Sequence, residues 1–244
     1  MMRMVLLSAF AVLFFTITDA AGAFETDAIE TSAGRLEITF LGHGSLMFAT
    51  GGKIIHVDPY SAVADYARLP RADLVLITHE HADHLDLKAL EAVRTEKTAV
   101  VLTEACAKQV KGGIVLHDGD VQTVSGFRIE AVPAYNLVHM RSEGVPFHPK
   151  GSGNGYIVTF GDKKVYVAGD TENTPEMKGL NGIDIAFLPM NLPYTMTPEM
   201  VADAAKAFKP KILYPYHTGN TDTSRLVRLM RDTKEVEVRL RSMK

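Results

Sequence analysis

The stretch Leu74-Val-Leu-Ile-Thr-His-Glu-His-Ala-Asp-His84 places three histidines and an aspartate directly behind a run of apolar residues. The run from Leu74 to Thr78 is typical of a strand that is buried on both faces. The three imidazoles and the carboxylate that follow cannot be buried cheaply without partners. On a loop at the end of a strand they can converge on cations instead, so we interpret this segment as a metal-binding loop.

The spacing within the loop indicates how it would bind metal. His79 and His81 are two residues apart, so in an extended segment their side chains project to the same side and can bind one ion. Asp83 and His84 lie on the turn into the next helix and can point to a second ion nearby. Imidazole and carboxylate ligands suit zinc, with manganese or iron as alternatives.

Short strand patterns alternate with helical ones on both sides of this loop, without a long low-complexity linker. The strands fall into two batches, each mixed with helices and each ending in a helix and a strand. This order predicts one α/β domain of two stacked β-rich halves with helices outside. The expected strands are 35–40, 46–50, 53–57, 74–78, 98–102, 121–124, 127–132, 156–160, 165–168, 183–188, 212–216 and 236–240. The expected helices are 86–94, 104–111, 197–208 and 224–231.

The segment from Tyr135 to Gly155 has no periodicity and is rich in Gly, Pro, His and Asn. A loop of this length inside a compact domain is usually functional or disordered. Its end, Gly151-Ser-Gly-Asn-Gly155, precedes a strand rather than a helix, so it does not fit a phosphate-binding loop. We interpret it as the flexible hinge of a lid, in which Lys150 could bind an anionic group.

Composition excludes several classes of function. Apolar residues make up 46% of the 244 residues and charged residues 23%, as in a globular protein with a sizeable core. The net charge is −3 and no run of Lys or Arg favours a nucleic acid or an anionic membrane as partner. Cys106 is the single cysteine, so no intramolecular disulfide can form, and we expect a buried structural thiol. Nothing in the sequence fixes the oligomeric state.

The N-terminus has the pattern of a signal peptide. Arg3 provides a positive start, the residues from Val5 to Ile17 are almost wholly apolar, and Ala21-Gly22-Ala23 offers small residues for cleavage before Phe24. An uncleaved anchor is the alternative. No later segment is apolar for long enough to span a bilayer. We therefore expect a signal peptide at 1–23, a single mature domain at 24–244, and a periplasmic or secreted protein.

The loop sequence HxHxDH resembles the hallmark of the metallo-β-lactamase superfamily, and other landmarks recur in order. They are Val57-Asp58-Pro59, Ala168-Gly169-Asp170-Thr171 and Tyr214-Pro-Tyr-His217. The strings Phe40-Leu-Gly-His43-Gly-Ser, Leu188-Pro-Met-Asn and Tyr194-Thr-Met-Thr look more specifically like the ascorbate-6-phosphate lactonase (UlaG-like) branch. The resemblance implies a four-layer αββα sandwich, in which two β-sheets are flanked by helices.

The resemblance also implies a set of metal ligands. Two divalent cations would be held by His79, His81, Asp83, His84, Asp170 and His217, with Asp170 bridging the two and Asp58 fixing the metal-binding loop. The family takes a third histidine for the first metal from the position after Pro133-Ala134-Tyr135, where this chain has Asn136. Either Asn136 is a weak oxygen ligand, or His148 or His139 reaches in from the long loop. We prefer His148.

The other histidines carry less information. His43 could line the pocket and bind a substrate oxygen, or it could be structural. His56 lies inside a predicted strand and His117 in a predicted turn, so we expect a buried structural residue and an exposed one.

These features predict a metal-dependent hydrolase. Two cations about 3.5–4 Å apart would activate a water for attack on a small polar lactone, ester or amide. Asp83 and Asp170 would be the catalytic carboxylates, as ligands first, and Asp83 could then pass a proton to the leaving group. The alternatives are a phosphodiesterase on the same metal core and a non-catalytic metal-binding or interaction protein on a decayed scaffold. The departure at Asn136 is what supports that last alternative.

Overall fold

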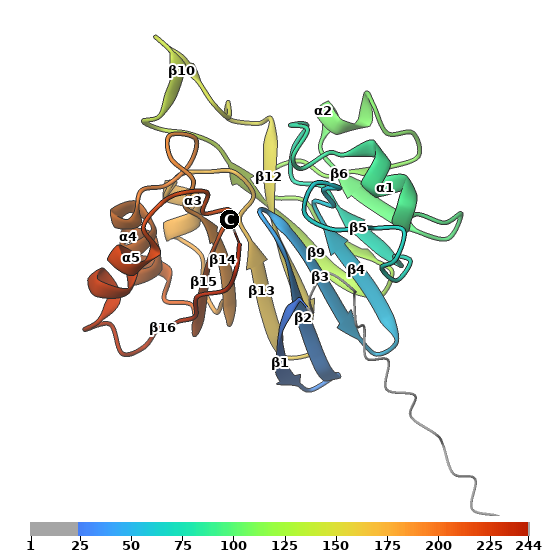
Figure 1. Ribbon diagram of the computed structural model, residues 1–244, viewed down its shortest axis with the longest axis horizontal. Coiled ribbons are helices and arrows are strands. Elements are labelled where there is room, and N and C mark those ends of the chain that lie inside the picture. The colour runs from blue at the N-terminus through green and yellow to red at the C-terminus, as the bar shows by residue number, and fades with distance from the viewer. Residues whose placement is uncertain (1–23, 244) are drawn as a thin grey trace, which may run out of the picture.

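Two mixed seven-stranded sheets pack face to face in the structure, a computed structural model that describes residues 24–243 (Figure 1). The first sheet has the order β1 (Glu25–Thr31), β2 (Gly34–Gly42), β3 (Ser45–Thr50), β4 (Lys53–Val57), β5 (Leu74–Leu76), β6 (Ala99–Leu102), β7 (Ile114–Val115). The second has the order β16 (Glu237–Val238), β15 (Ile212–Tyr216), β14 (Ile185–Pro189), β13 (Lys163–Val167), β12 (Gly153–Phe160), β9 (Phe127–Ala134), β8 (Val121–Val124).

Helices cover the outer face of each sheet. The helices α1 (Leu87–Val93) and α2 (Glu104–Ala107) pack on the first sheet, and α3 (Pro175–Lys178), α4 (Pro198–Phe208) and α5 (Thr223–Met230) pack on the second. The central core lies between the sheets, where the ring centroids of Phe48 and Phe187 from opposite sheets are 6.1 Å apart. Each sheet has one further core, which lies between its outer face and the helices that cover it. The predicted αββα sandwich is therefore confirmed.

Parallel strand pairing brings the site loops to one rim. Strand β5 pairs in parallel with β4 and β6, and β14 pairs in parallel with β13 and β15. Ligands of α/β sheets bind at the carboxyl ends of such strands. Asp58 follows β4, the His79 loop follows β5, Asp170 follows β13 and His217 follows β15. The topology thus places segments about 160 residues apart in sequence at one edge of the sandwich.

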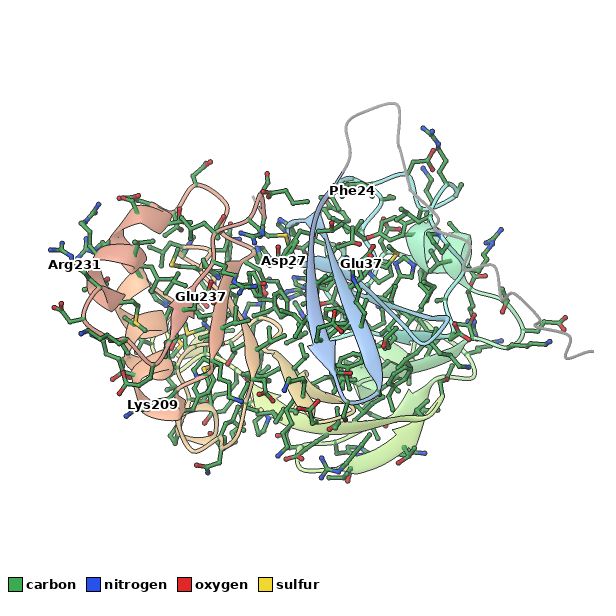
Figure 2. The ribbon with its side chains drawn as sticks, turned by 90° about the horizontal axis from the view of Figure 1, so that it is seen from below. Phe24, Asp27, Glu37, Lys209, Arg231 and Glu237 are labelled. Carbon is green, nitrogen blue, oxygen red and sulfur yellow. The ribbon has the colours of Figure 1, made fainter. Side chains whose placement is uncertain are left out.

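Several predicted boundaries are wrong. Strand β1 was not predicted, because it is largely exposed and its sequence, ETDAIET, has few apolar residues. Its Asp27, which is labelled in Figure 2, is held by Arg241, whose Nη2 lies 2.6 Å from both carboxylate oxygens. The predicted helix 104–111 ends at Ala107, and the closing strand is only two residues long.

The long loop is more ordered than its sequence indicates. It contains a hairpin of β10 (Met140–Ser142) and β11 (Val145–Pro146), which projects from the body in Figure 1. The predicted hinge is also wrong for Gly153 to Gly155, which open strand β12 and pair with β9. A Cβ on Gly155 would lie 2.8 Å from the Ala168 carbonyl oxygen, so this glycine permits close strand packing rather than motion.

Within these described residues, no helix is long and apolar enough to cross a membrane. The predicted signal peptide, residues 1–23, lies outside the described part of the chain. Cys106 is a buried free thiol, as expected, and His117 is exposed.

His56, in β4, is a buried structural histidine. Its side chain is fully buried, and its Nε2 donates to the carbonyl oxygen of Pro70 at 3.1 Å while its Nδ1 has no hydrogen-bond partner. Burial lowers the pKa of His56 from 6.5 to about 4, against the effect of the Pro70 hydrogen bond.

This lowered pKa predicts an acid-sensitive fold. The unfolded chain binds a proton at His56 more readily than the folded protein, so stability is lost as the pH falls from about 6.5 towards 4. Between pH 7 and pH 5 this group should cost about 2 kcal/mol. We expect His56→Asn to be less stable at pH 7 but to lose about 2 kcal/mol less over that interval, measured by urea unfolding. Equal losses in the variant and the unchanged protein would contradict this, and His117→Asn is the exposed control.

Candidate metal centre

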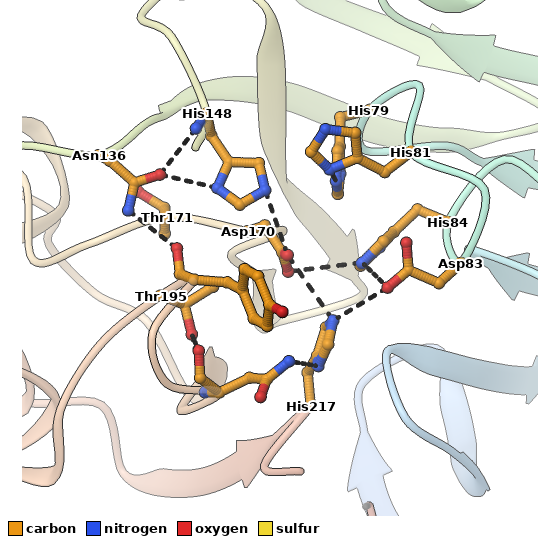
Figure 3. Close-up of polar contacts among 12 residues, drawn as sticks. His79, His81, Asp83, His84, Asn136, His148, Asp170, Thr171, Thr195 and His217 are labelled. Atoms are coloured by element: carbon orange, nitrogen blue, oxygen red, sulfur yellow. Dashed lines mark hydrogen bonds and ion pairs between the residues drawn. The ribbon is translucent and has the colours of Figure 1, made fainter. Parts of the chain in front are cut away.

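The predicted ligands converge at the rim between the two sheets, as Figure 3 shows. Their ligand atoms form three groups, within each of which all atoms lie within 4.8 Å of one another. The groups are His79, His81 and His148; His43, Asp83, His84 and His217; and His79, His84 and Asp170.

The buried carboxylate of Asp58 fixes the start of the metal-binding loop. Its Oδ1 accepts from the Thr78 backbone N–H at 2.8 Å, and its Oδ2 accepts from the Thr78 hydroxyl at 2.6 Å. The same Oδ2 lies 2.8 Å from His84 Nδ1. Because His84 Nδ1–H donates to this carboxylate, His84 Nε2 is left to face the site. Asp58 thus has the positioning role that the resemblance implied.

Three imidazoles form the first ligand group. His79 Nδ1 contacts the Thr78 hydroxyl at 3.0 Å, and His79 Nε2 lies 3.0 Å from His81 Nδ1. The His148 ring stands 5.1 Å from that of His79 and 5.0 Å from that of His81. Burial, the largest effect, lowers the pKa of His79 well below its usual value and that of His148 to about 4. Both rings are therefore neutral near pH 7, which is the form that binds metal.

The second group combines imidazoles with a carboxylate that is open to solvent. Asp83 Oδ2 lies 3.6 Å from His217 Nε2, 3.8 Å from His84 Nε2 and 2.9 Å from His43 Nε2. The Asp83 side chain is 36% exposed, whereas those of His84 and His217 are buried. Burial opposes ionisation of Asp83, but the neighbouring imidazoles of His217 and His43 lower its pKa below the usual range. The carboxylate is therefore ionised where it meets solvent.

Asp170 lies between the two groups. Its Oδ2 is 3.4 Å from His148 Nε2 and 3.6 Å from His217 Nε2, and its Oδ1 is 3.5 Å from His84 Nε2. Burial would raise the pKa of Asp170, but the surrounding imidazoles lower it, so the carboxylate is ionised. One anionic side chain therefore faces ligand nitrogens of both groups.

The donor set fits divalent cations. The buried atoms His84 Nε2, His217 Nε2 and Asp170 Oδ1 have no hydrogen-bond partner among the described residues. Buried polar atoms without partners are costly and uncommon. Burial would lower the pKa of His84, yet Asp170 and Asp58 raise it to about 9, so the site favours positive charge. A metal ion at His84 Nε2 would replace the proton that this potential favours, and it would also give His217 Nε2 and Asp170 Oδ1 a partner.

Asn136 contacts both the backbone and the ring of His148 through its side-chain oxygen. Asn136 Oδ1 accepts from the His148 backbone N–H at 2.8 Å and from His148 Nδ1 at 2.7 Å (Figure 3). This contact holds the ring in the tautomer whose Nε2 faces Asp170. The structure thus brings His148, the preferred candidate, to His79 and His81, and leaves Asn136 one shell further out.

Glu172 organises this corner of the site and was missed in the sequence. Its buried carboxylate accepts the backbone N–H groups of 137–139 at 2.7 Å and the Asn136 amide at 3.1 Å. It also holds His139 Nδ1 at 2.6 Å, so His139 lies outside the ligand groups. The one available signal was an acidic residue placed directly after Gly169-Asp170-Thr171.

His43 is packed into the second group. Its ring lies 3.7 Å from that of His217, and its carbonyl oxygen accepts the His217 backbone N–H at 2.9 Å. His43, Asp58 and His217 all have positive φ, at 53°, 43° and 48°. Such strained backbone persists only where its surroundings hold it, and it is common at functional sites. The Asn191 side-chain amide, also missed in the sequence, contacts His217 Nδ1 at 3.2 Å.

A cavity of about 440 Å³ opens above these residues. Arg141, Phe147 and Tyr194 line it together with members of both ligand groups. A larger cavity of about 680 Å³ lies beside α1, but none of the candidate ligands lines it. The chemistry of the side chains, not the volume, identifies the site.

Comparison with known proteins agrees with this geometry. A family model described as the beta-lactamase superfamily domain matches residues 37–217. The chain belongs to the metallo-β-lactamase superfamily. A UPF0173 metal-dependent hydrolase of Thermococcus onnurineus is 31% identical over 219 residues, which cover 82% of this chain and 95% of the relative. Another, of Pelotomaculum thermopropionicum, is 30% identical over 194 residues, covering 75% of this chain and 84% of the relative.

Solved structures of the superfamily give the same result. A protein of Parabacteroides distasonis that is classed as a metal-dependent hydrolase is 49% identical, with a TM-score of 0.86, over 91% of this chain and all of that one. Igni18, a metallo hydrolase of Ignicoccus hospitalis, is 26% identical with a TM-score of 0.69, covering 86% of this chain and 96% of that one. This chain is accordingly a metal-dependent hydrolase of the superfamily.

The different positions of His148 and Asn136 predict different losses of metal. His148→Ala removes a ligand atom and should lower the metal content of the purified protein. Asn136→Ala keeps every ligand but frees the His148 ring, so metal affinity should fall about 10–100-fold. Elemental analysis would measure the metal content, and competition with a chelator would measure the metal affinity. His117→Ala is the exposed control. A greater loss in Asn136→Ala than in His148→Ala would identify Asn136 as the ligand.

Proposed function

We propose that this hydrolase cleaves a lactone, ester or amide of a small polar molecule with two divalent cations, zinc as first choice. The observation that carries the proposal is the position of Asp170, whose carboxylate faces ligand nitrogens of two separate groups. The first ion would be held by His79, His81 and His148, the second by Asp83, His84 and His217, and both by Asp170. Two cations held in this way would supply an activated water and would neutralise the charge that develops on oxygen.

Other side chains at the site hold the imidazole rings in place or transfer a proton. Asp58, Asn136 and Asn191 hold the rings of His84, His148 and His217, so that their free nitrogens stay aimed at the site. Asp83 is ionised and reaches solvent, and its Oδ2 lies 2.9 Å from His43 Nε2. This pair can accept the proton that the nucleophile releases and deliver it to the leaving group.

The resemblance to the ascorbate-6-phosphate lactonase branch supports the choice of a lactone or ester over a phosphodiester. The non-catalytic alternative rested on Asn136, and the position of the His148 imidazole beside His79 and His81 supports the catalytic interpretation instead. The relatives named as metal-dependent hydrolases agree with a catalytic protein.

Removing the shared carboxylate tests the mechanism. We expect Asp170→Ala to lower kcat/KM by about a thousandfold or more, because it separates the two ligand groups. Turnover would be followed on matched lactone, ester, amide, phosphodiester and β-lactam substrates with added zinc or manganese. Circular dichroism would show that the fold is intact, and Asp232→Ala, an exposed carboxylate, is the control. Undiminished turnover in Asp170→Ala would refute the assigned mechanism, and faster cleavage of the phosphodiester than of the lactone would refute the substrate class.

We further propose that the protein is exported to the periplasm or secreted, since the sequence of residues 1–23 has the charge, apolar length and small residues of a signal peptide. The expected mature chain begins at Phe24. Intact-mass measurement of the full-length protein expressed in a bacterium should find this chain outside the cytoplasm. Replacing Ala23 with Asp should block the cleavage, whereas an unprocessed cytoplasmic protein would contradict the proposal.

A further inference from the structure

Arg141 is a cationic side chain on the wall of the site cavity. It belongs to β10 in the projecting hairpin, and it lines the cavity together with Asp83, Asp170 and His217. Among the described residues that line this cavity, it is the one Lys or Arg. A fixed positive charge at this place is available to a substrate.

No carboxylate neutralises this charge in the described part of the chain. The contact that Arg141 makes is with an aromatic ring, since its guanidinium carbon lies 5.8 Å from the centre of the Phe147 ring. Lys150, the cation considered from the sequence, is different. Its Nζ lies 2.6 Å from Glu176 Oε1 and 3.5 Å from the Tyr135 hydroxyl, and it does not line the cavity. Arg141 is therefore the cation that is free to bind an anion.

Aromatic packing holds Arg141 near the ligands. The Phe147 ring meets that of Tyr194 edge-on at 5.0 Å, and Phe147 directly precedes His148 in the chain. The Tyr194 carbonyl oxygen accepts from the Asn136 amide at 2.9 Å, the same amide group that positions His148. The aromatic residues beside the Arg141 guanidinium are thus linked, through Asn136, to the candidate ligand His148.

Exposed apolar side chains are frequent in the two loops that carry Arg141 and Tyr194. Ten large hydrophobic residues are exposed in the described chain, and six of them belong to these two loops. They are Leu137, Val138, Met140 and Val145 in the hairpin loop, and Leu192 and Tyr194 in the facing loop. Such a surface favours a ligand whose body is at least partly apolar.

We infer that the substrate carries an anionic group, a carboxylate or a phosphate, apart from the bond that is cleaved, and that Arg141 binds this group. The planar guanidinium presents paired N–H donors that match the oxygens of either anion. This inference rests on the proposed hydrolysis and adds to it a specificity residue. Arg141 selects the substrate and does not take part in breaking the bond.

Matched esters separate this role from catalysis. The p-nitrophenyl monoester of glutaric acid ends in a carboxylate, and its glutaramate counterpart ends in a neutral amide of nearly the same shape. We expect Arg141→Gln to lower kcat/KM about 10–100-fold on the acid and to change it little on the amide. The loss should lie mainly in KM, and Arg141→Lys should recover part of it. A third ester that ends in a phosphate shows which of the two anions is preferred.

The matched control is Lys150→Gln, which removes a positive charge from the same long loop. It should leave the preference for the charged ester unchanged. The inference is overturned if Arg141→Gln affects both esters equally, or if Lys150→Gln abolishes the preference instead.

Chemical footprinting tests the anion site without any turnover. Phenylglyoxal modifies accessible arginines, and mass spectrometry of peptides would follow Arg141 against Arg128, which is paired with Glu130. We expect glutarate or inorganic phosphate to protect Arg141, in the metal-loaded protein and in Asp170→Ala alike. Protection without hydrolysis of any ester would refute the proposed reaction and keep the anion site. Hydrolysis without protection would refute the anion site alone.

Discussion

The buried carboxylate of Asp58 is the constraint on which the site depends. It sits at the end of β4 and accepts hydrogen bonds from the Thr78 backbone, the Thr78 hydroxyl and the His84 ring. A fully buried carboxylate is tolerated only when such donors surround it. These bonds join the ends of two neighbouring parallel strands and set the orientation of the loop between them. Thr78 and His84 are the two ends of the loop that carries His79, His81 and Asp83. By holding both ends, Asp58 orients the side chains between them.

The cost of burying so many polar groups makes the metal part of the structure. His84, His217 and Asp170 each bury an atom that no other described residue satisfies. The neutral state of His79 and His148 and the ionised state of Asp170 are both suited to cations. Metal binding would therefore give these buried atoms a partner and would also supply the hydrolytic chemistry. The strained backbone at His43, Asp58 and His217 is held by the same contacts.

The body and the mouth of the site are built differently. Most candidate ligands follow strands that are anchored in the central core, whereas His148 shares the long loop with Arg141 and Phe147, and Tyr194 lies in the loop after β14. Loops change their sequence with less cost to the core than strand ends do. Substrate selection can therefore lie in these loops while the candidate metal core supplies the hydrolytic chemistry.

The sequence by itself determined an α/β domain of two β-rich halves with a metal-binding loop at 79–84, and the resemblance to the superfamily added the αββα layers and the candidate ligands Asp170 and His217. It could do so because buried strands and the turns that follow them leave local patterns in the chain. It left His148, His139 and Asn136 open, because these residues lie in a segment without periodicity. Only the tertiary structure places the His148 ring beside His79 and His81, in contact with Asn136, and the His139 ring on the Glu172 carboxylate. It also exchanged Lys150 for Arg141 as the free cation, since a charge is paired or unpaired by neighbours that are distant in sequence.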